Sequence, residues 1–194
     1  MSSGILFLVV GQSGVGKDTL LDGARAALAG SADFVFARRV ITRPADAGGE
    51  DHEAVGAQEF ARRKASGAFL FSWSAHGLEY GLSVQIADEL ARGRHVVANG
   101  SRDTIAALAA RVSRLVVIEV TADPEIVAMR LKVRGRESGE AMSERMTRTT
   151  PPIPANVQTI HVANDADVTT GTERLVTALT TAAAGSAAQR AVKV

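Results

Sequence analysis

A glycine-rich loop between an apolar run and an amphipathic stretch constrains this chain more than any other segment. Residues 5–10 read ILFLVV, and the loop Gly11-Gln-Ser-Gly-Val-Gly-Lys17 follows at once. The apolar run indicates a buried strand, and the periodicity after the loop indicates a helix that begins near Lys17. Glycines adopt the positive φ that such a loop needs, and N–H groups at a helix N-terminus attract anions. The sequence therefore predicts a phosphate-binding loop.

This loop supplies the predicted nucleotide site. We expect Lys17 to place its ammonium group on the β- and γ-phosphates of ATP and to act in catalysis, while the loop backbone cradles the phosphates. The predicted nucleotide-binding residues are Gly11, Gln12, Ser13, Gly14, Val15, Gly16, Lys17, Asp18 and Thr19.

The residue after Lys17 departs from the usual phosphate-loop pattern. A serine or threonine ordinarily stands there and binds Mg²⁺ through its hydroxyl, but this chain has Asp18, with Thr19 one position later. Either Asp18 meets the metal, directly or through water, or Thr19 takes over part of that role. A third interpretation is that Asp18 only complements the helix dipole. We expect Mg²⁺ as a cofactor and assign Asp18 to it.

Composition limits the class of protein. The chain has 194 residues, of which 46% are hydrophobic, so we expect one domain with one core over residues 1–194. Lys plus Arg number 22 against 21 Asp plus Glu, which gives no indication of a nucleic-acid or membrane partner. The absence of cysteine excludes disulfides and thiolate metal sites. No run reaches the ~18–20 apolar residues of a membrane helix. We expect a cytoplasmic protein.

Strand and helix patterns alternate along the chain. Strands are expected at residues 5–10, 34–40, 94–98, 115–120 and 157–162, and helices at about 17–29, 57–66, 83–92, 101–111, 124–133, 142–149 and 170–184. This alternation predicts a three-layer α/β fold with a parallel central sheet. Two insertions interrupt it, at about 36–82 and about 134–148. Because ligands of such sheets bind at the carboxyl ends of the strands, we predict an acceptor-binding insertion and an arginine-rich lid.

The first insertion resembles the nucleoside-monophosphate-binding segment of guanylate kinases. The resemblance rests on Thr42-Arg43-Pro44, on residues 48–52 (GGEDH), and on the pairs His76-Gly77 and Tyr80-Gly81, and it extends over residues 5–165. It fails at the positions that read guanine in that family. Asn99 replaces an aspartate, Leu82 replaces a serine or threonine, and the segment before His76-Gly77 lacks the glutamate. The base-binding groups are missing.

The variant motifs together resemble the ribose 1,5-bisphosphate phosphokinase family of guanylate-kinase-like phosphate-loop kinases. These motifs are GKD, ITRPA, GGEDH, SWSAHGLEYG and VVANGSR. The resemblance implies ATP-dependent phosphorylation of ribose 1,5-bisphosphate to 5-phospho-α-D-ribose 1-diphosphate in phosphonate breakdown. Two alternatives stay open: a guanylate kinase or other nucleotide or small-metabolite kinase, and a non-catalytic guanylate-kinase-like interaction module. The intact loop argues against the module.

The residue types fit phosphoryl transfer, which depends on positioning and on neutralisation of charge. We expect Arg39 and Arg43 to form bidentate hydrogen bonds to the acceptor phosphate and Tyr80 to donate a hydrogen bond to it from its hydroxyl. Glu50 is a candidate acceptor of hydrogen bonds from sugar hydroxyls, and Trp73 is expected to pack in the core.

Two further predictions concern the carboxy-terminal half of the chain. In the lid, Arg134 or Arg136 is the predicted catalytic arginine. By the resemblance, Asn164-Asp165 belong to a loop against adenine.

Overall fold

Five parallel strands form the central sheet, in the order β2-β7-β1-β8-β9. The computed structural model describes residues 3–47, 49–134 and 151–191. The strands are β1 (Leu6–Val10), β2 (Phe34–Phe36), β7 (His95–Asn99), β8 (Leu115–Thr121) and β9 (Gln158–Ala163). The middle strand β1 leads into the glycine-rich loop, which therefore lies at the carboxyl edge of the sheet.

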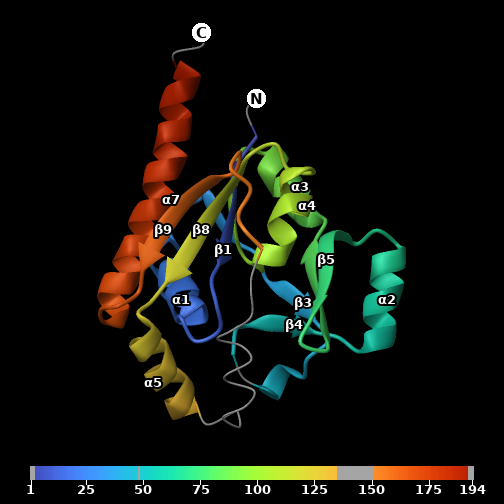
Figure 1. Ribbon diagram of the computed structural model, residues 1–194. Helices are drawn as coiled ribbons and strands as arrows, with labels where there is room; N and C mark the ends of the chain where they lie inside the picture. The colour runs from blue at the N-terminus through green and yellow to red at the C-terminus, as the bar shows by residue number, and fades with distance from the viewer. Residues whose placement is uncertain (1–2, 48, 135–150, 192–194) are drawn as a thin grey trace.

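Helices cover both faces of this sheet (Figure 1). Side chains alternate along β1, so Phe7 and Val9 pack beneath α1 (Lys17–Ala27) and α7 (Val168–Ala191). Leu6, Leu8 and Val10 face the opposite core, which includes α3 (Gln85–Ala91) and α4 (Ile105–Ala109). The predicted three-layer α/β fold is confirmed. Helix α5 (Pro124–Arg134) follows β8 beyond the carboxyl edge.

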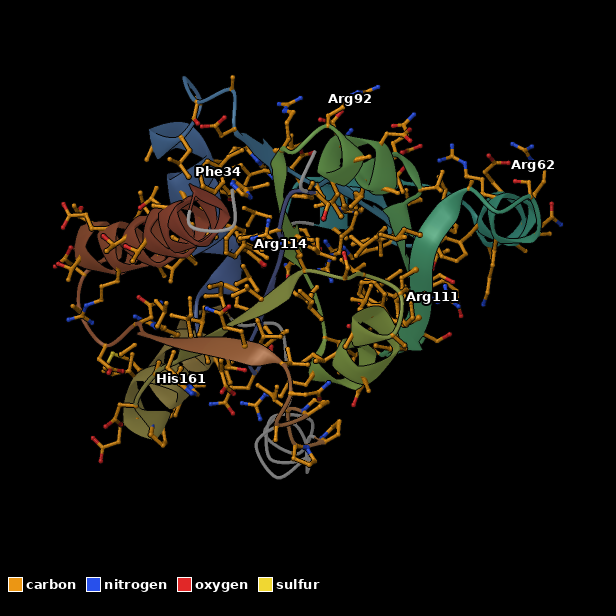
Figure 2. All side chains as sticks on the ribbon, turned by 90° about the horizontal axis from the view of Figure 1, so that it is seen from above. Phe34, Arg62, Arg92, Arg111, Arg114 and His161 are labelled. Atoms are coloured by element: carbon orange, nitrogen blue, oxygen red, sulfur yellow. The ribbon has the colours of Figure 1, made fainter. Side chains whose placement is uncertain are left out.

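The first insertion forms a second, smaller sheet with the order β4-β3-β6-β5. Its strands are β3 (Arg39–Ile41), β4 (His52–Ala54), β5 (Phe69–Ala75) and β6 (Leu78–Ser83). The turn between β5 and β6 is His76-Gly77, whose φ angles of 53° and 71° suit a primed hairpin turn. Helix α2 (Ala57–Ala65) lies on the outside, with Arg62 pointing away from the main body (Figure 2).

Several element boundaries differ from those predicted. The single strand expected over residues 34–40 is wrong: β2 pairs with β7 in the main sheet, while β3 pairs with β6 in the small one. The helix expected at 101–111 is a short 3₁₀ turn, η2 (Arg102–Thr104), followed by α4. The helix expected at 142–149, and the lid beyond residue 134, lie outside the described residues. None of the helices in the described ranges is both long and apolar enough to cross a bilayer.

Candidate active site

The loop between β1 and α1 has the conformation that its glycines permit. Gly14 and Gly16 have φ angles of 86° and 90°, which side-chain-bearing residues rarely adopt. A Cβ on Gly16 would lie 2.6 Å from Nδ2 of Asn164, and one on Gly14 would lie 2.9 Å from Cγ of Leu131. Both glycines are therefore fixed by conformation and by lack of space.

Asn164 supports this loop from the end of β9. Its buried Nδ2 donates a hydrogen bond of 2.7 Å to the carbonyl of Val15, and Nη1 of Arg130 donates to the same carbonyl at 3.3 Å. The sequence had placed Asn164 in a loop against adenine. The structure brings Asn164 into contact with the phosphate loop, and the place of this segment beside adenine stays a prediction.

Lys17 folds back across the loop that precedes it. Its Nζ donates to the carbonyls of Gly11 at 2.6 Å and of Gln12 at 3.0 Å. The ammonium group therefore lies beside the backbone that would surround a polyphosphate.

A hydrogen-bond network joins the phosphate loop to the insertion. Nδ2 of Asn99, at the end of β7, donates to Oδ1 of Asp18 and to Oε2 of Glu50, each at 3.0 Å. Glu50 in turn accepts from Nε of Arg39 at 2.8 Å and 3.0 Å and forms an ion pair with Nη2 of Arg39. One amide thus connects the predicted metal carboxylate with the predicted acceptor arginine.

An aromatic wall fixes the guanidinium of Arg39. Trp73 and Tyr80 stack with ring centres 5.3 Å apart and an interplanar angle of 11°. The Cζ of Arg39 lies 5.0 Å from the ring centre of Tyr80 and 5.7 Å from that of Trp73. Cation–π contact and the Glu50 ion pair both limit the orientations of this guanidinium.

These groups surround a cavity of about 460 Å³ at the carboxyl edge of the main sheet. The lining joins the phosphate loop, the ends of β7 and β8, and the small sheet. The lining residues are Gly11, Gln12, Ser13, Val15, Lys17, Asp18, Arg39, Trp73, Ala75, His76, Tyr80, Asn99, Gly100, Ser101, Arg102, Asp103, Val120, Thr121 and Ala122. A phosphate loop facing an arginine–tyrosine pair across one cavity is suited to holding two phosphorylated ligands.

Other predicted residues are not brought to this lining. Gly14 and Gly16 shape the loop from behind, and Thr19 is exposed on α1. Glu50 is not among the lining residues, and its carboxylate accepts hydrogen bonds from Arg39 and Asn99, which do line the cavity. Their contact with a ligand stays a prediction.

Arg43 packs against His52 rather than lining the cavity. Its Nη2 lies 3.2 Å from Nδ1 of His52, and Nε2 of His52 lies 3.0 Å from the carbonyl of Arg43. Nε of Arg43 is buried and has no hydrogen-bond partner within the described part of the chain. Its role toward the acceptor also remains a prediction.

The predicted lid arginines cannot be placed at the cavity. Arg134 is the last residue of α5, and its side chain falls outside what the structure describes, as does the whole of Arg136.

Sequence reasoning missed several residues of the lining. Trp73 packs against the apolar core, as expected, and it also forms part of the cavity wall. Ser101 and Arg102 also line the cavity, and their position directly after a strand end is the signal that could have found them.

Asp18 fits a magnesium site. Mg²⁺ keeps several waters and usually takes only one or two protein carboxylates together with substrate phosphates. Asp18 lines the cavity beside the phosphate loop, which satisfies that demand. The described residues contain no group of three or more His, Cys, Asp or Glu side chains that could hold a metal by themselves.

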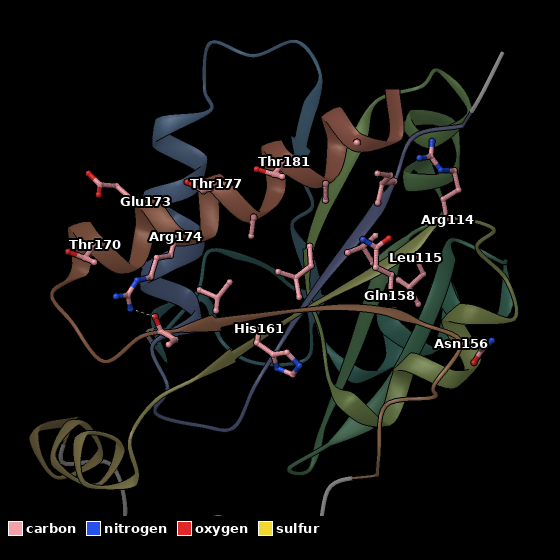
Figure 3. Close-up of a pocket in the computed structure, with 18 of the residues that line it drawn as sticks. Arg114, Leu115, Asn156, Gln158, His161, Thr170, Glu173, Arg174, Thr177 and Thr181 are labelled. Atoms are coloured by element: carbon pink, nitrogen blue, oxygen red, sulfur yellow. Dashed lines mark hydrogen bonds between the residues drawn. The ribbon is translucent and has the colours of Figure 1, made fainter. Parts of the chain in front are cut away.

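A second cavity, of about 1020 Å³, lies between α7 and β9 (Figure 3). Thr170, Arg174 and Thr177 of α7 and His161 of β9 are among its lining residues, the His161 ring pointing away from α7. Nη1 of Arg174 donates to the carbonyl of Ala163 at 2.9 Å. None of its lining residues belongs to the phosphate loop or the insertion. The phosphate-loop cavity is therefore the candidate active site.

No protein-family model matches the chain. Two curated relatives match it over most of both lengths. The ribose 1,5-bisphosphate phosphokinase PhnN of Thiobacillus denitrificans is 42% identical, over 97% of this chain and 99% of that protein. The chain belongs to the ribose 1,5-bisphosphate phosphokinase family. The family's Agrobacterium fabrum protein of the same name is 45% identical, over 85% of each.

The family also includes much longer proteins. The bifunctional ribose 1,5-bisphosphokinase-thymidine phosphorylase of Azorhizobium caulinodans is 54% identical over 92% of this chain. The chain spans only about a quarter of that relative's length, 26%.

Solved structures confirm the phosphate-loop kinase fold. A guanylate kinase from Anaplasma phagocytophilum superimposes with a TM-score of 0.59 at 18% identity, covering 93% of this chain and 86% of that one. A gluconokinase from Sinorhizobium meliloti 1021 gives 0.56 at 16% identity, covering 97% and 99%.

Proposed function

We propose that this protein transfers the γ-phosphoryl group of ATP to the 1-phosphate of ribose 1,5-bisphosphate, giving 5-phospho-α-D-ribose 1-diphosphate. The observation that carries the proposal is the cavity itself: a phosphate loop faces the Arg39–Tyr80 pair, without the side chains that would read guanine. Family membership supports the same substrate. We place the reaction in phosphonate breakdown.

The chemistry asks little of the protein beyond positioning. An oxygen of the acceptor phosphate forms a bond to the γ-phosphorus, and the bond from that phosphorus to the bridging oxygen of ADP breaks. The acceptor oxygen is already ionised at neutral pH, so the transfer needs no general base. The donors of the loop and Lys17 hold the ATP phosphates, as their places in the cavity indicate. Mg²⁺, when bound, would neutralise phosphate charge, and Asp18 would hold it.

Arg39 and Tyr80 are the proposed acceptor-phosphate site. Arg39 is held between Glu50 and the aromatic wall, so its guanidinium loses little freedom when it binds a phosphate. Tyr80 is only 8% exposed and lines the cavity beside it. Glu50 positions Arg39 in this account, in addition to its predicted contact with sugar hydroxyls.

Guanine recognition is not supported by the residues at the corresponding positions. Leu82 is fully buried in the apolar core with Ile86 and Leu90, where it can offer no hydrogen bond. The amide Nδ2 of Asn99 donates hydrogen bonds to Asp18 and Glu50. At these two positions only Oδ1 of Asn99 remains to bind the base, so a nucleoside monophosphate would bind mainly through its phosphate.

The proposal is tested by incubating the protein with ATP, Mg²⁺ and a panel of acceptors that includes ribose 1,5-bisphosphate, ribose 1-phosphate and GMP. Phosphorus NMR identifies the diphosphate formed, and Lys17→Ala serves as the inactive control. The proposed function predicts a sugar 1-diphosphate with ribose 1,5-bisphosphate. Turnover confined to GMP would favour a guanylate kinase, and no turnover with any acceptor would favour a non-catalytic module.

A further inference from the structure

Arg102 crosses the end of the central strand to reach its ion-pair partner. It begins η2, separated from the end of β7 by Gly100 and Ser101, and its Nη2 pairs with Oε1 of Glu119 on β8. Strand β1 lies between β7 and β8, and Glu119 stands in register with Val10, the residue before the phosphate loop. The side chain of Arg102 therefore passes over the carboxyl end of β1, where Gly11 starts the loop. It lines the same cavity as Lys17 and Arg39.

Glu119 is a buried carboxylate with two partners. Its side chain is 9% exposed, and its Oε2 lies 3.2 Å from Nδ1 of His161 on β9. A buried carboxylate is costly unless its partners stay in place, so this ion pair fixes the orientation of the guanidinium. Arg102 itself is 29% exposed, at the wall of the cavity. A guanidinium carries five N–H donors in a planar fork, a geometry that matches the oxygens of both carboxylates and phosphates.

We propose that Arg102 is a further catalytic residue, whose guanidinium binds the phosphoryl group during its transfer, and that Glu119 is its positioning residue. The inference rests on the proposed function only in requiring transfer of the γ-phosphoryl group of ATP. The arginine donates hydrogen bonds to the equatorial oxygens of that group and stays protonated throughout. Donors fixed before the reaction are effective because the protein does not have to reorganise as charge shifts.

A purely structural ion pair makes a different prediction. If Arg102 only balanced the charge of Glu119, its replacement would lower the free energy of unfolding without a specific effect on the transferred group. The test therefore needs a measurement that depends on that group alone. ADP with Mg²⁺ and aluminium fluoride mimics the phosphoryl group in transfer, and ADP with Mg²⁺ does not.

The experiment compares wild type with Arg102→Ala, Arg102→Lys, Glu119→Gln and the double variant that combines Arg102→Ala with Glu119→Gln. Arg92→Ala is the matched control, because Arg92 is an exposed arginine at the carboxyl end of α3, paired with Glu89 and outside the cavity. For each protein, kcat and KM are measured with ribose 1,5-bisphosphate. The affinity for ADP with Mg²⁺ is measured by calorimetry, with and without aluminium fluoride, and the melting temperature checks folding.

Arg102→Ala should lower kcat about 10²–10³-fold, with both KM values within about threefold of wild type. Arg102→Lys keeps the charge but loses the planar fork, so kcat should fall at least about tenfold while the melting temperature stays near wild type. Both variants should lose most of the tighter binding that aluminium fluoride gives wild type, with unchanged affinity for ADP alone. Glu119→Gln should lower kcat about tenfold and add nothing further to Arg102→Ala.

The proposal is overturned if Arg102→Lys keeps both kcat and the aluminium fluoride effect within about threefold of wild type. If Arg102→Ala fails to fold, the result for Arg102→Lys decides. An increase in KM for the acceptor with unchanged kcat also overturns the proposal. If wild type does not phosphorylate ribose 1,5-bisphosphate, the proposed function fails. The aluminium fluoride comparison still decides the role of Arg102 in that case, because it contains no acceptor. Wild type that binds ADP equally with and without aluminium fluoride contradicts the inference.

Discussion

At the scale of single residues, the amide of Asn99 determines how much negative charge the site can hold. Its Nδ2 lies 3.0 Å from a carboxylate oxygen of Asp18 and from one of Glu50, so a single amide nitrogen donates to two carboxylates. An aspartate at this position would bring a third carboxylate to the same point and would remove the donor. Like charges at such distances disfavour the ionised forms.

Asn99→Asp is therefore expected to lower kcat/KM at neutral pH by about ten- to a hundredfold, the range for a lost hydrogen bond to a charged group. The added carboxylate should have a raised pKa, so activity should recover in part as the pH falls and one carboxyl group takes up a proton. The pH profiles of both proteins, measured from about pH 5 to pH 9, check this. Parallel profiles would show that Asn99 does not control the charge of the site.

Asp18→Asn should raise the Mg²⁺ concentration needed for half-maximal rate by about tenfold or more, while the KM for ATP at saturating Mg²⁺ changes less. The reason is that Asp18 is the carboxylate that lines the cavity beside the phosphate loop. Asp18→Ser restores the usual loop sequence and should keep the Mg²⁺ requirement closer to wild type. An unchanged Mg²⁺ titration in Asp18→Asn would restrict Asp18 to a helix-dipole role.

At the scale of elements, the small sheet carries the acceptor side of the site. The hairpin of β5 and β6 could have been predicted, because Phe69, Phe71 and Trp73 alternate with other residues and His76-Gly77 provides the turn. The three-residue strands β3 and β4 could not, since no periodicity is visible over so short a run. They pair in parallel across the intervening segment, with Arg39 in register with His52.

Helix α2 of this insertion carries an acid-sensitive ion-pair network. Hydrogen bonds from Arg62, and then from Arg63, lower the pKa of Glu59 from 4.5 to about 2, and Arg63 also pairs with Glu53 of β4. Because the folded-state pKa is depressed, the contribution of Glu59 to stability is complete above its ordinary pKa and is lost as the pH falls toward about 2.

Glu59→Gln should therefore lower the melting temperature slightly at neutral pH and leave it less sensitive to acid than wild type. The effect should be small, because Arg62 is largely exposed, Glu59 and Arg63 are partly exposed, and water screens their charges. Melting temperatures measured from about pH 6 down to about pH 2 provide the test. Equal acid sensitivity in both proteins would mean that Glu59 adds nothing to the stability of α2.

At the scale of the whole molecule, two sheets meet at one cavity. The alternation of strands and helices was enough to predict the main parallel sheet and the position of the phosphate loop at its carboxyl edge. The contacts that complete the site were beyond prediction, because they depend on the order of the strands. Asn164 binds the carbonyl of Val15, 149 residues earlier in the chain. Arg102 pairs with Glu119 because the strand order places β7 and β8 on either side of β1.

The most direct test of the account is the ratio of kcat/KM for ribose 1,5-bisphosphate to kcat/KM for GMP, measured with the two acceptors in competition for ATP. The cavity offers a phosphate site at Arg39 and Tyr80, whereas Leu82 offers guanine no hydrogen bond and Asn99 has its N–H groups engaged by Asp18 and Glu50. A ratio of at least about a hundred in favour of the sugar bisphosphate is the predicted result. A ratio below one would contradict the account and make this protein a guanylate kinase.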